Sequence, residues 1–236
     1  TSQHPSIRLS DFKKRFTNIR ETILKDHKSL FLEQLDDLIY KVNIFGYHFA
    51  TLDIRQDSRI HNKAFSEIIK LLINNRSLDE DPFYDEMDID QKLNFLSKLK
   101  GNLNPNEIKN TILKSTLESI RSIKTIQKSN GEKGANRYII SNNQSAVNIM
   151  EVFAMFRLSD WSNPTVDIVP LFETVSDLEN ARSVMKSVYQ NKNYRNHLSN
   201  RNNEQTIMLG FSDGTKDGGY LMANWSILKA KESLTS

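Results

Sequence analysis

The feature that most constrains the fold is a fourfold alternation of short apolar segments with amphipathic ones. Each unit has a stretch of β-forming residues, a polar tip, and then apolar residues at helical spacing. The four β-forming stretches are residues 49–54, 137–141, 165–172 and 206–211. Because this alternation is typical of a parallel sheet with helices outside it, the sequence predicts an α/β fold that is predominantly helical and has about four parallel strands.

Helical spacing of apolar residues predicts the helices around these strands. Two helices fit within residues 9–41, with Ser10 and Ser29 as N-caps and Gly46 closing the second. Asp57 and Ser58 are expected to begin a helix that runs to about residue 75. An acidic segment, 76–90, is expected to be a surface excursion. Further helices are expected over 90–100, 106–128, 144–158, 176–188 and 220–230, with Gly101 and Pro105 between the first two.

The segment 205–225 has the composition of a functional site. Four of the chain's 8 glycines lie between Gly210 and Gly219, together with Asp213, Lys216 and Asp217. We expect a polar turn here, between a buried strand and a helix. The other three tips carry Arg55, the polar run 141–143, and Glu173. Since the carboxyl ends of parallel strands meet at one edge of a sheet, Arg55, Glu173 and Asp213 are expected to converge although they are far apart in sequence.

These three side chains suggest a particular chemistry. The two carboxylates Glu173 and Asp213 form a candidate binding site for a hard divalent cation, because such a cation takes oxygen ligands. An arginine at the same edge suits a phosphate or carboxylate group through its planar fork of donors. A metal beside an arginine implies a phosphorylated, anionic substrate. The alternative is structural: each carboxylate caps the helix that follows it, and Arg55 pairs with Asp53 or Asp57.

Composition narrows the function classes. With 32 basic and 29 acidic residues the net charge is +3, too small and too evenly spread for a nucleic-acid surface. The absence of cysteine excludes disulfides and thiolate metal sites. No apolar run approaches the length of a membrane span, and no secretory signal opens the chain. We therefore expect a cytoplasmic protein with no nucleic-acid or membrane partner.

Four segments, in order, resemble phosphoenolpyruvate carboxylases. They are FGYHFATLDIRQDSRIH from residue 45, RYIIS from 137, VPLFETVSDLENA from 169 and MLGFSDGTKDGG from 208. The resemblance covers nearly the whole chain, and the combination of LDIRQ, PLFET and SD-x-x-KD is specific. It implies that the chain is an internal fragment, residues 1–236 being a single region of a larger catalytic barrel. That barrel would be of the (β/α)8 TIM type, here partial, elaborated with extra helices and assembled as a cytoplasmic homotetramer.

The resemblance also implies an activity and residue roles. The parent enzyme would carboxylate phosphoenolpyruvate with bicarbonate, giving oxaloacetate and phosphate. Arg55 corresponds to an arginine of the phosphoenolpyruvate site, and Glu173 and Asp213 to the carboxylates that hold Mg²⁺ or Mn²⁺. Lys216 corresponds to a lysine linked with bicarbonate binding or site structure. The catalytic histidine and the glycine-arginine-rich loop of the family have no counterpart here, so the fragment alone is expected to be inactive. Two alternatives remain open: another metal-dependent barrel enzyme acting on phosphorylated keto acids, and a non-catalytic helical interaction module.

Overall fold

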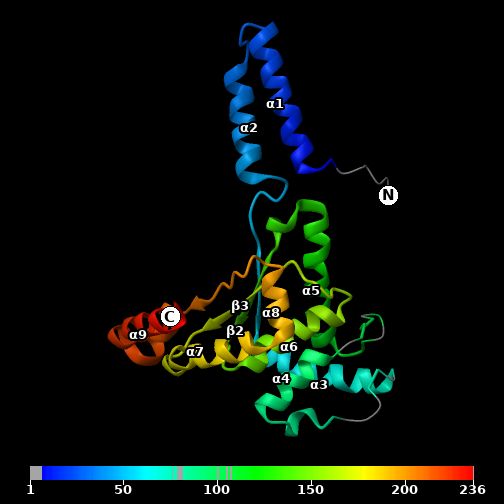
Figure 1. Cartoon of the computed structure of the whole chain (residues 1–236), viewed down its shortest axis with the longest axis vertical. Coiled ribbons are helices and arrows are strands. Elements are labelled where there is room, and N and C mark those ends of the chain that lie inside the picture. The colour runs from blue at the N-terminus through cyan, green and yellow to red at the C-terminus, as the bar shows by residue number, and fades with distance from the viewer. Residues whose placement is uncertain are drawn as a thin grey trace. The chain divides into compact units, whose positions relative to one another are not determined.

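The computed structural model describes residues 7–75, 77–78, 82–99, 101–104, 106 and 108–235 (Figure 1). The chain divides into two compact units, Thr1–Leu52 with Ile123–Asn136 and Asp53–Ser122 with Arg137–Ser236. The elements are α1 (Leu9–Asp26), α2 (Leu32–Phe45), β1 (Asp53–Asp57), α3 (Ser58–Asn74), the 3₁₀ turn η1 (Tyr84–Glu86), α4 (Ile89–Lys98), α5 (Thr111–Asn130), η3 (Glu132–Gly134), β2 (Arg137–Ser141), α6 (Ala146–Leu158), β3 (Asp167–Phe172), α7 (Val175–Gln190), α8 (Lys192–Ser199), β4 (Met208–Leu209) and α9 (Phe211–Thr235).

The first unit is built around a helical hairpin. Figure 1 shows α1 and α2 as neighbouring antiparallel helices, and a bidentate ion pair joins them, with Arg20 Nε 2.6 Å from Asp36 Oδ1 and Nη2 3.1 Å from Oδ2. Gly46 ends α2 with a φ of 53°, as the sequence predicts. Neither helix buries a residue, so the pair has no core of its own.

The second unit contains a four-stranded parallel sheet. Its strand order is β1-β2-β3-β4, so each strand pairs with its neighbour in sequence. This confirms the predicted α/β class with about four parallel strands. In the register, Arg55 lies beside Ile139, and Ile139 beside Val169. Because paired residues of parallel strands point to the same face, Arg55 shares a face with these two apolar residues.

The two faces of the sheet differ in what covers them. Tyr138 points to the helical side, where its ring packs edge-on against Phe156 of α6 at 5.5 Å and its hydroxyl lies 2.8 Å from His61 Nε2 on α3. Helix α6 is apolar on nearly all sides and buries every residue except Asn148 and Arg157. The opposite face carries a buried cluster of Ile139, Val169 and Leu171. Arg55 therefore stands on the face turned away from α3 and α6.

Several predicted boundaries are wrong. The first strand begins at Asp53 and not at residue 49, because only Asp53–Asp57 pairs with β2; Phe49 has a φ of 58°, which a strand does not allow. Arg55 is consequently inside the strand and not beyond it. The N-caps predicted at Ser10 and Ser29 are also wrong, since the residues before α1 and α2 are Arg8 and Phe31.

The largest correction concerns residues 211–218, which are helical and not a polar turn. Helix α9 begins at Phe211, one residue after the two-residue strand β4, and the chain bends at Gly219, whose φ is 81°. Helix α8 was not predicted, and α5 begins at Thr111, five residues later than expected. Some of the expected boundaries lie outside the described residues. These are Lys100, at the expected end of one helix, and Pro105, before the next. Arg76 and 79–81 of the expected surface excursion also lie outside the described residues.

Candidate functional site

An ion pair links two of the residues that the sequence singles out. Arg55 Nη2 donates to Glu173 Oε1 at 2.8 Å, joining β1 to the end of β3, two strands away. The Arg55 side chain is about half exposed (52%), whereas the Glu173 side chain is 17% exposed. The structural alternative, in which Arg55 pairs with Asp53 or Asp57, is not observed, because Asp53 lies 3.7 Å from Arg137 and Asp57 binds Arg59.

Glu173 also accepts a hydrogen bond from the backbone between these strands. The N–H of Asn142, just after β2, donates to Glu173 Oε2 at 2.7 Å. Asn142 has a φ of +52°, and Ser58 Oγ donates to its carbonyl at 2.6 Å. The carboxyl ends of β1, β2 and β3 are thus tied together around one carboxylate, which takes a cationic donor on one oxygen and a neutral donor on the other.

Glycine allows the chain after β4 to approach the backbone of Glu173 closely. The Gly210 N–H donates to the Phe172 carbonyl at 2.8 Å. A β-carbon on Gly210 would lie 3.2 Å from Glu173 Cα and 3.4 Å from its Cγ, tighter than most such contacts. One turn later, Gly214 faces the Glu173 carbonyl, 3.5 Å from where its β-carbon would be. The start of α9 therefore rests against the backbone that carries Glu173.

Asp217 fixes the same helix through the N-terminus of α7. Its Oδ2 accepts the N–H of Val175, the first residue of α7, at 2.9 Å. A β-carbon on Gly218 would lie only 2.7 Å from Val175 Cγ2, so this glycine is needed for the close packing of α9 on α7. Gly218 is thus explained by the close packing of a helix. The sequence had predicted a polar turn at this position.

Asp213 and Lys216 lie one turn apart on this first part of α9. Lys216 Nζ is 3.4 Å from Asp213 Oδ1, and the two side chains are 77% and 47% exposed. The structure shows no hydrogen bond between the described side chains of Asp213 and Glu173. It brings Arg55 onto Glu173, and it places Asp213 on a helix whose first turn touches the Glu173 backbone.

Glu173 does not cap the helix that follows it, which was the structural alternative. Helix α7 is capped by Thr174, whose side chain accepts from the Asp177 N–H, and Asp177 completes a capping box. Glu173 is therefore not a helix cap, and its two carboxylate oxygens accept from Arg55 and from the Asn142 N–H instead. Asp213 lies within the first turn of α9, where a negative charge interacts favourably with the helix dipole.

The carboxylates of Glu173 and Asp213 are the type of ligand that a hard divalent cation binds. Carboxylate oxygens are the preferred protein ligands of Mg²⁺, which usually takes one or two and completes its shell with water and substrate oxygens. Within the residues described, no three histidine, aspartate or glutamate side chains gather closely enough to hold a metal by themselves. A metal at Glu173 and Asp213 would therefore need water and substrate oxygens as further ligands.

Among the buried ionisable groups outside this edge are His61 and Glu151. Burial lowers the pKa of His61 to about 4, so its ring is neutral near pH 7 and serves the core. Glu151 is fully buried in α6, and burial raises its pKa to about 7. Sequence reasoning missed Glu151, although one carboxylate within the apolar run AVNIMEVFAMF is a visible signal.

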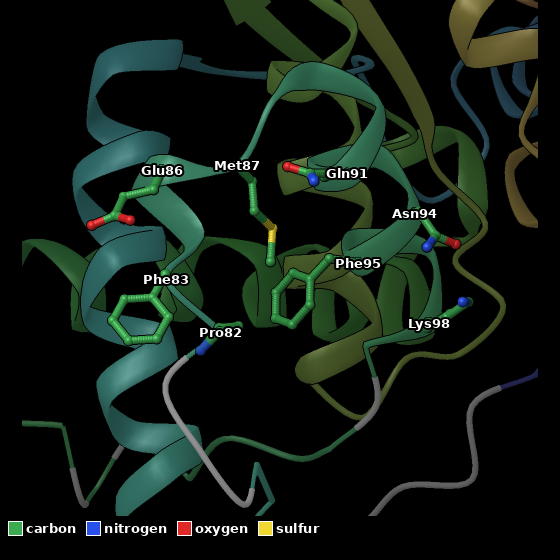
Figure 2. Close-up of a pocket in the computed structure, with 8 residues that line it drawn as sticks. All are labelled: Pro82, Phe83, Glu86, Met87, Gln91, Asn94, Phe95 and Lys98. Carbon is green, nitrogen blue, oxygen red and sulfur yellow. The ribbon is translucent and has the colours of Figure 1, made fainter.

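Among the hollows on the second unit are two that can be compared with the site. One, of about 530 Å³, is formed by η1 and α4, and Figure 2 shows the Met87 side chain extending toward the Phe95 ring. It is mainly apolar and contains none of the residues above. The other, of about 670 Å³, borders the site and is lined by Asp57, Arg59, Lys63, Asn142 and their neighbours. Arg59 holds the pKa of Asp57 below its usual range through a side-chain hydrogen bond.

The fold and the site define an α/β protein with an acidic and basic cluster at the carboxyl edge of a parallel sheet. Comparison with known families is specific: the family model for phosphoenolpyruvate carboxylase matches residues 3–236. The chain belongs to the phosphoenolpyruvate carboxylase family.

A curated relative agrees with this assignment. The chain is 34% identical over 226 residues to a phosphoenolpyruvate carboxylase of Nitrosomonas europaea, an alignment that covers 90% of this chain and 24% of the relative. The chain therefore spans about a quarter of the relative's length. Among the described residues, no helix is both long enough and apolar enough to pass through a membrane.

Proposed function

We propose that this chain is part of an enzyme that carboxylates phosphoenolpyruvate with bicarbonate, giving oxaloacetate and phosphate. The observation that carries the proposal is the contact between Arg55 and Glu173. It joins the LDIRQ and PLFET segments, which lie 118 residues apart in a chain that the family model matches almost throughout. The reaction is inferred from the family. The contact between Arg55 and Glu173 indicates a charged site at the sheet edge where that reaction could occur.

In this proposal Arg55 binds the phosphoryl group of phosphoenolpyruvate. Its guanidinium has a planar fork of donors that matches phosphate oxygens, and the half-exposed side chain can reach them. Glu173 and Asp213 hold Mg²⁺ or Mn²⁺, and Lys216 assists bicarbonate binding or supports the site. When bound, the metal supplies positive charge that neutralises the phosphate and the developing enolate.

The chemistry implied by the family has two stages. A bicarbonate oxygen attacks phosphorus and the bond to the enol oxygen breaks, which gives carboxyphosphate and the enolate of pyruvate. The enolate carbon then bonds to CO₂ released from carboxyphosphate, and phosphate leaves. The contribution of Arg55 is to hold the phosphoryl group in line with bicarbonate, so positioning and electrostatic stabilisation supply most of the rate enhancement.

The larger architecture belongs to the same proposal. Four parallel strands in sequential order are what one half of a (β/α)8 barrel contains. We propose that residues 1–236 form one region of such a barrel, completed by chain beyond this sequence. From the resemblance, the parent enzyme is a cytoplasmic homotetramer.

The test uses the complete enzyme that contains this chain. Asp213→Asn removes one carboxylate charge from an exposed helix turn, so metal-dependent oxaloacetate formation should fall at least tenfold while the circular dichroism spectrum is unchanged. The matched control is Asp26→Asn, an equal charge change at the exposed end of α1. Wild-type turnover of Asp213→Asn at limiting Mg²⁺ would refute the metal role.

The same assay separates the alternatives. Release of phosphate from phosphoenolpyruvate without any need for bicarbonate would favour another metal-dependent barrel enzyme acting on phosphorylated keto acids. Absence of both turnover and divalent-cation binding in the complete protein would favour a non-catalytic interaction module. Oxaloacetate formation that requires both bicarbonate and the metal supports the carboxylase.

A further inference from the structure

Glu173, proposed above as a metal ligand, is already neutralised by a cation of the protein. Its side chain is 17% exposed, and a carboxylate so shielded from water needs a compensating charge or donor. Arg55 provides that charge on Oε1 at 2.8 Å, and the Asn142 N–H provides a neutral donor on Oε2 at 2.7 Å. Oε1 is therefore the oxygen that binds the Arg55 guanidinium, and a metal ion at Oε1 would take the place of that guanidinium.

A divalent cation bound at Oε1 would disfavour the Arg55 guanidinium at the same oxygen. Like charges within hydrogen-bond distance of the same oxygen repel each other strongly in a partly shielded site. Asn142 is neutral and can keep its hydrogen bond. The Arg55 side chain is about half exposed, so it can swing away from Glu173 with little loss of packing.

We propose that Arg55 is a placeholder cation that exchanges with the metal: it neutralises Glu173 when no metal is bound, and metal binding releases it to bind the phosphate of the substrate. This inference rests on the proposed function and specifies how its two ligands are coupled. Metal binding makes Arg55 available to the substrate, and the bound anion draws Arg55 away from Glu173. Each ligand therefore raises the affinity for the other by the same factor.

The exchange predicts that one substitution raises the affinity for Mn²⁺ and lowers the affinity for phosphoenolpyruvate. Arg55→Gln removes the competing cation, so the affinity for Mn²⁺ without substrate should rise by about fivefold, the value for losing a half-exposed ion pair. The same variant should bind phosphoenolpyruvate more weakly, and Mn²⁺ should no longer strengthen that binding. A residue that only bound phosphate would leave the affinity for Mn²⁺ alone unchanged.

A second arginine provides the matched control. Arg59 also lies within the electrostatic influence of Glu173, but its hydrogen bonds go to Asp57. Arg59→Gln removes the same charge from the same region, and it should change Mn²⁺ affinity by less than about twofold. Arg55→Lys keeps the charge and should also bind Mn²⁺ within about twofold of the wild type.

The experiment measures free Mn²⁺ by electron paramagnetic resonance in titrations of the complete enzyme, with and without phosphoenolpyruvate and with no bicarbonate. Tighter Mn²⁺ binding by Arg55→Gln alone supports the exchange. Unchanged or weaker binding by that variant overturns it, and so does equal tightening by Arg59→Gln, which would show a general electrostatic effect.

Glu173→Gln separates this inference from the proposed function. If that variant loses Mn²⁺ binding while Arg55→Gln has wild-type affinity, the proposed metal site stands and only the exchange is wrong. If Glu173→Gln binds Mn²⁺ as the wild type does, the proposed site is wrong and the exchange falls with it.

Discussion

The buried carboxyl group of Glu151 should make the stability of the second unit depend on pH. Glu151 Oε1 accepts from the Tyr84 hydroxyl at 2.9 Å and from Asn62 Nδ2 at 3.3 Å. Among the described residues, none makes a hydrogen bond with Oε2. Burial raises the pKa above its ordinary value, opposed by these two hydrogen bonds and by the positive charge of Lys92. The protonated form is therefore favoured in the folded state.

The sign and size of the effect follow from linkage. Because the pKa is about 7 in the folded state against an ordinary 4.5, the contribution of Glu151 to stability is fully present below pH 4.5. It is lost as the pH rises from 4.5 through 7. A rise of about 2.5 in the pKa corresponds to at most roughly 3 to 4 kcal/mol, at about 1.4 kcal/mol for each pH unit.

Glu151→Gln removes this dependence, because the amide keeps an acceptor for Tyr84 and Asn62 but cannot ionise. We expect the variant and the wild type to have similar free energies of unfolding at pH 4.5. At pH 8 the variant should be the more stable by about 1 to 3 kcal/mol.

Urea unfolding at both pH values, followed by tryptophan fluorescence, measures the difference. Trp161 is a suitable probe because its ring packs at 5.6 Å against Phe156 on the same helix as Glu151. Glu179→Gln, a change at an exposed position of α7, is the control and should show no such divergence. The reasoning is refuted if the difference between Glu151→Gln and wild type is the same at pH 4.5 and pH 8, or has the opposite sign at pH 8.

Three further predictions concern α9 and the chain as a whole. Gly218→Ala should destabilise the fold by about 1 to 3 kcal/mol, because its β-carbon would lie 2.7 Å from Val175 Cγ2; Gly214→Ala, which meets only ordinary contacts of 3.5 Å or more, is the control in the same thermal unfolding assay. Asp217→Ala should cost about 1 kcal/mol by leaving the Val175 N–H without its acceptor, whereas Asp217→Asn retains an acceptor and should cost less in urea unfolding. The isolated 236-residue chain should form no oxaloacetate from phosphoenolpyruvate, bicarbonate and Mg²⁺, and turnover within tenfold of the complete enzyme would contradict this.

Local sequence patterns were sufficient where neighbouring residues decide the structure. The strand Arg137–Ser141 and the start of α3 after its cap at Asp57 were both predicted correctly. A short β-forming run between polar residues and a capping side chain before an apolar face are signals within a few residues of each other. The family was also evident from short motifs, since LDIRQ and PLFET are contiguous in the sequence.

Tertiary structure decided what depends on distant partners. β1 begins at Asp53 because β2 offers no partner before Arg137, and residues 211–218 are helical because small residues allow that segment to pack on α7. Helix α8 was missed because it buries only Tyr194, His197 and Leu198, too few for a clear period.

The charged site shows the same division. Sequence position alone indicated that Arg55 and Glu173 approach the same sheet edge, but it left the partner of Arg55 open among nearby carboxylates. Only the register of three parallel strands brings its guanidinium to a carboxylate 118 residues away. Propensity and capping act over one turn of helix, whereas strand register and burial are set by the whole unit. The positions of these charges could therefore be predicted from sequence, and their pairing could not.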